Sequence, residues 1–165
     1  MFRLAALAVA VASLNLTPAA LAQAGGGWQP YLDPDYGFSA ELPLGVFEVV
    51  DAQDTPGIAL REIGGQATVS LYGGPARGLT RDTLEARLET GSQVSTYRAG
   101  GDSWFVLSGY YEAQEAQDTI FYTKVLFSPN HETFSAFEIT FPAADKPRFE
   151  ALVERFEDNF TRPQR

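Results

Sequence analysis

Residues 119–128, with the sequence TIFYTKVLFS, carry large apolar side chains at both the odd and the even positions. These side chains belong to Ile120, Phe121, Tyr122, Val125, Leu126 and Phe127. Successive side chains of a β-strand point to opposite faces of its sheet, so a sheet with one wet face would carry polar residues at one set of positions. The pattern therefore predicts a strand at 119–128 that is covered on both faces.

Residues 103–113 repeat this pattern, with apolar side chains at both sets of positions. Turn residues recur at short intervals along the rest of the chain, as is typical of a strand-rich domain. They separate further expected strands at 36–42, 47–51, 58–63, 67–72, 93–99 and 133–141. Gly64 and Gly65 supply the positive φ of a tight turn, so 58–72 is expected to form a hairpin, which Gly73-Gly74-Pro75 would end.

A short helix is expected in the middle of the chain. Thr80 is a good N-cap residue, and Leu79 and Leu84 have the spacing of a hydrophobic staple across the first turn. Gly91 has the conformational freedom that a helix C-terminus often requires. These signals predict a helix that begins after Thr80 and ends near Gly91.

A second helix is expected to close the chain, with Asp145 as its cap and Pro147 in its first turn. Its apolar residues recur at the spacing of one helix face. They are Phe149, Leu152, Val153, Phe156 and Phe160. Two helices and a largely antiparallel sheet covered on both faces predict an α+β fold, a three-layer α/β/α sandwich, formed by a single domain over residues 35–162.

The first residues have the layout of a secretory signal peptide, predicted over 1–24. Arg3 precedes an apolar run, and Ala22-Gln23-Ala24 places small residues where a signal peptidase recognises them. We expect cleavage after Ala24, with cleavage after Ala22 as the alternative, and a flexible leader at 25–34. A transmembrane anchor is disfavoured because the run is shorter than the ~20 residues that span a bilayer, and a lipid anchor because the chain has no Cys. The mature protein is therefore expected in a bacterial periplasm, without stable membrane insertion.

The composition narrows the classes of partner. The formal net charge is −9, and loss of a signal peptide whose only charged side chain is Arg3 would make it −10. Such a surface repels phosphate backbones and anionic lipids, which argues against nucleic acid and bare membrane. With no Cys and one His, thiol chemistry and zinc or copper sites are not expected. About 140 residues remain after cleavage, enough for one core that needs no disulfides.

Three segments spread over the mature chain resemble one known family. They are Tyr36-Gly37-Phe38-Ser39 leading to Pro43, Trp104 to Gly109 followed by Phe121-Tyr122, and Phe141-Pro142 leading into the closing helix. Together they resemble the PsbP-like superfamily, which includes extrinsic photosystem subunits, a nuclear-import factor and many bacterial exported domains. The chain is similar to a periplasmic domain of unknown function in that superfamily. The resemblance implies a PsbP-like fold and a small non-enzymatic accessory protein, and it carries no set of functional residues to this chain.

No motif predicts a catalytic or metal centre, and no cofactor is expected. His131 lies in a turn, and no Ser lies in the G-x-S-x-G pattern of a Ser-His-Asp hydrolase. Asp33 and Asp35 lack the remaining ligands of a calcium loop, so a turn is the preferred interpretation. Carboxylates paired across strands would escape such a search. The acidic residues in or beside the expected strands are Glu112, Asp118 and Glu138.

Two charged side chains lie in the middle of expected strands, Lys124 and Glu138. Burial of either charge without a partner would be costly. One interpretation is an ion pair between them across neighbouring strands. The other is an uncovered part of the sheet that binds a partner, because aromatic patches with few charges are typical of interfaces. The residues of that partner surface would be Tyr110, Tyr122, Lys124 and Glu138.

From these features we expect an exported, non-enzymatic accessory or binding protein that acts on another cell-envelope protein. The alternative is a protein that binds a small molecule or a cell-wall fragment between helix and sheet, and a hydrolase ranks third. A flat apolar patch would favour the protein partner, and a pocket with aromatic walls and converging polar groups would favour the small ligand. Carboxylates clustered in a cleft would favour the enzyme.

Overall fold

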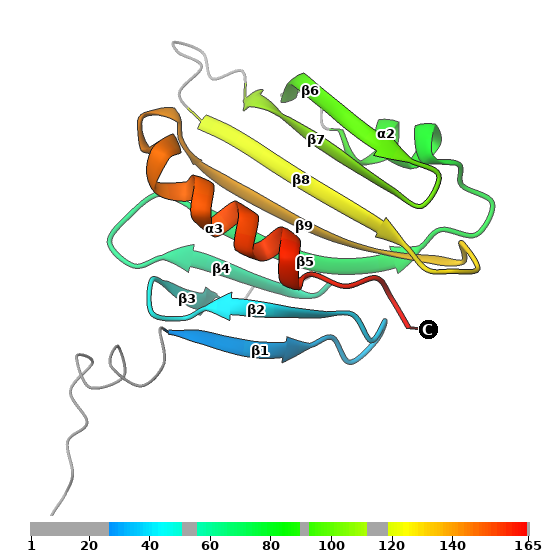
Figure 1. Cartoon of the computed structure of the whole chain (residues 1–165), viewed down its shortest axis with the longest axis horizontal. Helices are drawn as coiled ribbons and strands as arrows, with labels where there is room; N and C mark the ends of the chain where they lie inside the picture. Colours follow the sequence, from blue (N-terminus) through cyan, green and yellow to red (C-terminus); the bar gives the residue numbers. More distant parts are fainter. Residues whose placement is uncertain (1–26, 51–55, 90–92, 112–118, 165) are drawn as a thin grey trace, which may run out of the picture.

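The computed structural model describes residues 27–50, 56–89, 93–111 and 119–164 (Figure 1). The predicted signal peptide and both of its cleavage positions lie outside these residues, as does Gly91, the expected end of the first helix. Within the described ranges, no helix is long and apolar enough to cross a membrane.

The described residues form a mixed α/β fold in which every pair of adjacent strands is antiparallel. In chain order the elements are β1 (Trp28–Leu32), β2 (Ser39–Pro43), β3 (Phe47–Val50), β4 (Ile58–Glu62), β5 (Thr68–Pro75), α2 (Arg81–Leu88), β6 (Gln93–Gly101), β7 (Trp104–Tyr111), β8 (Thr119–Phe127), β9 (Thr133–Pro142), the 3₁₀ turn η1 (Ala143–Asp145) and α3 (Lys146–Asn159). A seven-stranded sheet has the order β3-β4-β5-β9-β8-β7-β6, and β1 and β2 form a two-stranded sheet. The prediction of a largely antiparallel sheet with two helices is confirmed.

The expected hairpin is present, with β4 and β5 paired around a turn in which Gly64 has a φ of 73°. Contrary to expectation, Gly73 and Gly74 do not end the hairpin but lie within β5. A Cβ atom at Gly73 would lie 2.4 Å from the ring of Tyr36, and one at Gly74 would lie 2.7 Å from the ring of Phe134. These two glycines therefore make room for aromatic rings.

The closing helix α3 packs on one face of the large sheet, as the spacing of its apolar residues predicts (Figure 1). Phe149 and Phe156 are fully buried. The ring of Phe156 stacks on Phe137 at a centroid distance of 5.4 Å, and the ring of Phe149 stacks on Phe141 at 4.8 Å. Phe160 follows the last turn and meets Phe137 edge-on at 5.1 Å. The main core is therefore built largely from phenylalanine rings.

The start of α3 differs from the prediction in one respect. Asp145 occupies the N-cap position, but its side chain makes no capping hydrogen bond. Its carboxylate accepts a hydrogen bond from Arg148 at 2.8 Å instead, and Arg148 also donates to Glu62 at the end of β4. The Arg148 guanidinium holds the pKa of the buried Glu62 carboxyl below its ordinary value of 4.5. Ion pairs, and not a side-chain cap, thus fix this end of the helix.

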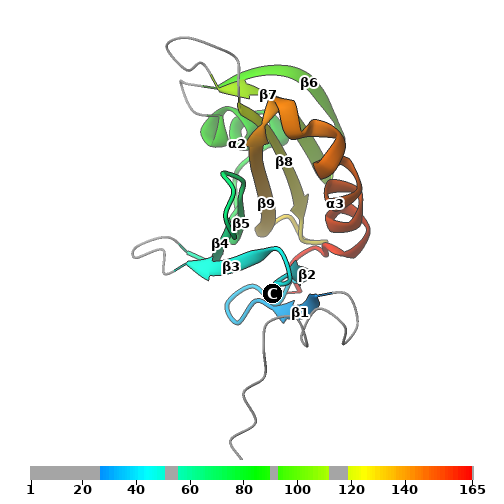
Figure 2. The ribbon, with the colours of Figure 1, turned by 90° about the vertical axis from the view of Figure 1, so that its left-hand side faces the viewer.

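The helix α2 lies against the face of the large sheet that α3 does not cover (Figure 2). Thr80 caps it as predicted, because its hydroxyl accepts the Thr83 N–H at 3.3 Å and the Thr83 hydroxyl accepts the Thr80 N–H at 2.8 Å. Leu84 is buried on this face with apolar side chains of the sheet. These are Phe105, Leu107, Phe121, Val125, Phe127, Phe134 and Ala136. The apolar side chains on one face of the sheet therefore pack with α3, and those on the other face pack with α2.

The prediction of a flexible leader at 25–34 is wrong for half of that segment, because residues 28–32 form the strand β1. The ring of Trp28 lies 5.7 Å from that of Phe156, and the ring of Tyr31 lies 6.2 Å from that of Phe38. Packing of these two aromatic side chains on the main core orders the segment. The folded domain therefore begins before residue 35.

Candidate functional site

The face of the large sheet that carries α3 is only partly covered by it. The helix packs on β2, β8 and β9, whereas β6 and β7 extend beyond it (Figure 1). Three adjacent strands each place a tyrosine on this open part. Tyr97 on β6 and Tyr122 on β8 both lie opposite Ser108, and Tyr110 lies two residues further along β7. Tyr97 is 57% exposed, and the other two tyrosines are half-buried.

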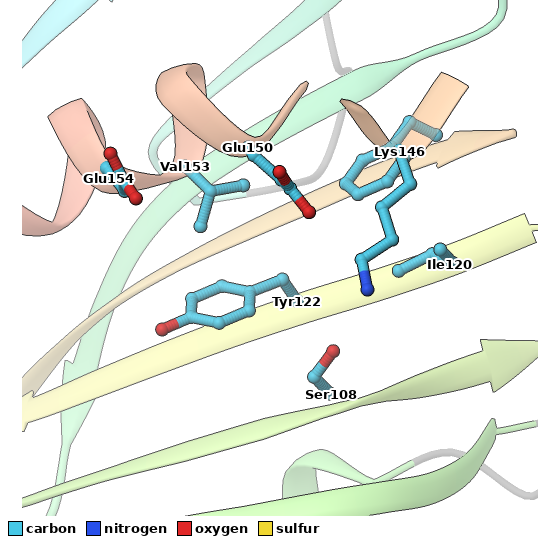
Figure 3. Close-up of a pocket in the computed structure, with 8 residues that line it drawn as sticks. Ser108, Ile120, Tyr122, Lys146, Glu150, Val153 and Glu154 are labelled. Atoms are coloured by element: carbon cyan, nitrogen blue, oxygen red, sulfur yellow. The ribbon is translucent and has the colours of Figure 1, made fainter. Parts of the chain in front are cut away.

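Two adjoining cavities lie between these tyrosines and α3. The first has a volume of about 300 Å³ and is lined by Ser108, Ile120, Tyr122, Phe141, Lys146, Glu150, Val153 and Glu154 (Figure 3). The second has a volume of about 330 Å³ and adds Thr96, Tyr97, Gly109 and Tyr110 to the shared residues. We refer to the two cavities together as the tyrosine groove. Its floor is aromatic and its helical wall carries charges.

Tyr97 reaches the groove because β6 contains a β-bulge. Ser95 lies opposite Gly109, but the next paired residue, Tyr97, lies opposite Ser108, so Thr96 is the extra residue. Without the bulge, Tyr97 would share the face of Ser95 on the other side of the sheet. One inserted residue therefore adds the third tyrosine to the groove.

One residue of the groove, Tyr122, belongs to a hydrogen-bond network around Glu157. The hydroxyl of Tyr122 donates to Glu157 Oε1 at 2.6 Å, and Lys124 Nζ donates to the same oxygen at 3.0 Å. Burial, followed by the Glu157 carboxylate, raises the pKa of Tyr122 above its ordinary value of 10. Tyr122 is therefore a neutral hydrogen-bond donor. The ammonium group of Lys124 forms an ion pair with Glu157 of α3.

The helical wall also carries charged groups that have no ion-pair partner among the described residues. Lys146 extends from the start of α3 over β8, with its ammonium group on the side of Ser108 (Figure 3). Glu150 and Glu154 follow on the same side of the helix at one-turn intervals, and both are exposed. The helical wall of the groove is thus charged along its length, with the ammonium group of Lys146 at one end and the carboxylates of Glu150 and Glu154 beyond it.

The structure divides the four residues that the sequence assigns to a partner surface. Tyr110, Tyr122 and Lys124 share the α3 face, whereas Glu138 lies opposite Thr123 and points to the other face. An ion pair between Lys124 and Glu138, one of the two interpretations that the sequence left open, is wrong, because Lys124 lies opposite Phe137 in the register. Side chains at successive register positions point to opposite faces, so the two charges are separated by the sheet itself.

Of the groove lining, the sequence assigned only Tyr110 and Tyr122 to a site. The residues that it missed include Tyr97, Lys146, Glu150 and Glu154. The bulge that turns Tyr97 has no sequence signal of its own. The three charged residues have one available signal, since they recur every four residues and so occupy one side of α3.

On the opposite face, Glu138 belongs to a separate polar cluster. Its carboxylate accepts hydrogen bonds from the Tyr111 hydroxyl at 3.1 Å, the Thr123 hydroxyl at 2.8 Å and Gln93 Nε2 at 3.4 Å. Burial, with a further contribution from the Glu138 carboxylate, raises the pKa of Tyr111 to about 12. The other two candidate carboxylates, at positions 112 and 118, lie outside the described residues.

The remaining candidates have local structural contacts. His131 lies in the β8–β9 turn with a φ of 57°, and its ring stacks on Phe127 at 5.3 Å. Asp33 is buried, and its Oδ1 accepts the N–H groups of Asp35 and Tyr36 at 3.1 and 2.7 Å, as in a turn. In the part of the chain that the structure describes, no three acidic, His or Cys side chains gather as metal ligands would.

Comparison with solved structures identifies the fold. The chain resembles cyanobacterial PsbP (CyanoP) from Synechocystis sp. PCC 6803, with a TM-score of 0.61 and 13% sequence identity over 85% of this chain and 95% of that one. At this identity the likeness is one of fold, and it supports the PsbP-like resemblance at that level. No protein-family model and no curated protein sequence matches the chain.

Proposed function

We propose that this protein is an exported, non-enzymatic accessory protein of the cell envelope that binds another envelope protein through the tyrosine groove. The observation that carries the proposal is the aromatic floor of Tyr97, Tyr110 and Tyr122, left uncovered beside α3. Membership of the PsbP-like superfamily, the three-layer description of the fold and a periplasmic location belong to the same proposal.

The chemistry of the groove suits recognition of a protein segment. Tyrosine rings contribute large contact areas with few rotatable bonds, and their hydroxyls remain able to hydrogen-bond at a wet boundary. The two cavities adjoin through Ser108, Ile120 and Tyr122, so an elongated occupant would contact both. Tyr97 and Tyr110 lie at the outer side of the groove, where a partner would cover them.

Crosslinking and pull-down with the tagged mature protein, from an extract of its own cell envelope, test this proposal. The paired substitution Tyr97→Ala and Tyr110→Ala should abolish capture of a partner that the unchanged protein retains. Leu32→Ala provides a control, because Leu32 is an exposed apolar side chain on β1, away from the groove. Equal capture by the groove variant and the control would contradict the proposal.

Export is tested separately by intact mass spectrometry of the secreted protein. The chain should begin at Gly25, or at Gln23 if the alternative cleavage position is used. A mass that retains Met1 in a membrane fraction would contradict the signal-peptide prediction.

The second candidate function is binding of a small molecule or a cell-wall fragment. It is favoured by the cavity of about 300 Å³ at the helix, whose aromatic and aliphatic lining is joined by the Lys146 ammonium and the Ser108 hydroxyl. Soluble muropeptides should then raise the melting temperature, and Lys146→Met should remove the effect. The described residues give no observation that favours a hydrolase over these two functions.

A further inference from the structure

Glu150 and Glu154 have no ion pair among the described residues, whereas three cations on or beside α3 are each paired with a carboxylate. Arg148 is paired with Glu62 and Asp145, and Arg155 is paired with Glu41 at 2.7 Å. Lys124 is held by Glu157. Among the described residues, none of these three cations is therefore available to Glu150 and Glu154.

Two arginines of α3 each place their guanidinium group against both an aromatic ring and a carboxylate. Arg155 lies over the ring of Trp28, 4.3 Å from its centroid, while its nitrogens donate to Glu41 at 2.7 and 2.9 Å. Arg148 lies over the ring of Phe149, 4.4 Å from its centroid, while it donates to Glu62. In both places the guanidinium group combines a carboxylate with an aromatic face, a favourable environment for arginine.

The tyrosine groove offers the same two components, and none of its described lining residues is an arginine. The carboxylates of Glu150 and Glu154 lie on its helical wall, and the rings of Tyr97, Tyr110 and Tyr122 form its floor. We infer that the groove binds an extended, arginine-bearing segment of a partner protein, with the guanidinium group between the glutamates and a tyrosine ring. This inference rests on the proposed function and names the chemistry of the partner.

Charge complementarity supports an arginine-bearing occupant over an acidic one. The chain carries a formal charge of −9, so a basic segment is attracted from a distance as well as at the site. Lys146 repels a second cation at the start of the helix, which places the guanidinium group at the end near Glu154.

The experiment is a titration of the mature, isotope-labelled protein with three end-blocked synthetic peptides, followed by NMR. The peptides alternate valine with arginine, with lysine or with glutamate. The arginine peptide should bind most tightly, should bind less tightly as salt is added, and should shift the amide signals of Tyr97, Glu150 and Glu154. The glutamate peptide should cause no comparable shifts.

Three variants test the assignment. Glu150→Gln with Glu154→Gln should weaken binding of the arginine peptide about twofold to thirtyfold, as expected for the loss of two exposed ion pairs. Lys146→Met should strengthen binding, because it removes the only repulsive charge on the described groove lining. Glu48→Gln with Glu132→Gln is the matched control, since it changes the net charge equally at exposed sites away from the groove.

Several results would overturn the inference. They are equal binding of the glutamate and arginine peptides, signal shifts away from the groove, and equal weakening by the control pair. Failure of the inference is distinguishable from failure of the proposed function. If the variant with Tyr97→Ala and Tyr110→Ala no longer captures the envelope partner but the variant with Glu150→Gln and Glu154→Gln still does, the groove binds a partner without the arginine contact. If neither variant alters capture, the proposed function itself is wrong.

Discussion

On one face of the seven-stranded sheet, the half under α3 is lined by phenylalanines, and the half beside α3 is lined by tyrosines. Phe137, Phe149 and Phe156 are at most 1% exposed. The rings of Phe137 and Phe156 stack on each other, and the ring of Phe149 stacks on that of Phe141. Tyr97 and Tyr122 present comparable rings but add a hydroxyl that needs a partner or water. One face of a single sheet thus changes from a buried core to a half-exposed surface.

The two halves also differ in how their charges are satisfied. At the covered half, Glu62 and Glu41 each accept hydrogen bonds from an arginine of α3, and these ion pairs attach the helix to the strands. At the open half, Glu150 and Glu154 have no such partner among the described residues. The carboxylates of the covered half are thus paired within the described residues, whereas those of the open half are exposed.

The largest expected effect belongs to the covered half. Phe156→Ala removes a fully buried ring that stacks on Phe137 and meets Trp28 edge-on, and should lower the free energy of unfolding by about 3–5 kcal/mol. Urea denaturation followed by circular dichroism measures this change. An unchanged urea midpoint would mean that α3 is not docked on the sheet, and the contrast between the two halves would disappear.

A smaller effect is expected where the start of α3 meets the sheet. The pKa of Glu62 is lowered, chiefly by the hydrogen bond from Arg148, so its stabilising contribution is full above pH 4.5 and is lost as the pH falls through the folded-state value. Glu62→Gln should therefore reduce the stability at neutral pH and flatten its decline in acid. Melting temperatures of both proteins between neutral and acidic pH test this, and parallel curves would contradict it.

At the boundary between the halves, Tyr122→Phe should cost about 0.5–1.5 kcal/mol, because it removes the hydroxyl that donates to Glu157. Because the pKa of Tyr122 is raised in the folded state, its stabilising contribution is fully present below pH 10. The contribution is lost as the pH rises from 10 through the folded-state pKa. Urea midpoints at neutral and alkaline pH should therefore differ less in the variant than in the unchanged protein. A variant of equal or greater stability would show that the hydroxyl serves the open surface and not the core.

The sequence predicts the covered half better than the open one, for a physical reason. The spacing of Phe149 and Phe156 identifies the buried side of α3, because residues that are buried recur at the period of the helix, and the buried Phe160 follows directly after its end. Register across strands has no such local signal. Lys124 and Glu138 were therefore assignable to a pair or to one patch, and only the alignment of β8 with β9 separates them.

The same limit applies to the other differences between expectation and structure. β1 contains Pro30 and is too short to show a strand pattern, and its order depends on the packing of Trp28 against a residue far away in the sequence. Tyr97 joins the groove through a bulge that the sequence does not reveal. Contacts between distant segments decide both features, so neither follows from local patterns.

The smallest expected effect on stability belongs to the outermost ring of the open half. Tyr97 is 57% exposed on an edge strand, so Tyr97→Ala should change the free energy of unfolding by no more than about 0.5 kcal/mol. Its effect on partner capture should nevertheless be large, because a partner that covers the groove would bury this ring. Urea denaturation and pull-down on the same preparation measure the two quantities together. A loss of stability as large as that of Phe156→Ala would place Tyr97 in the core, and the open half would then be an extension of the covered one.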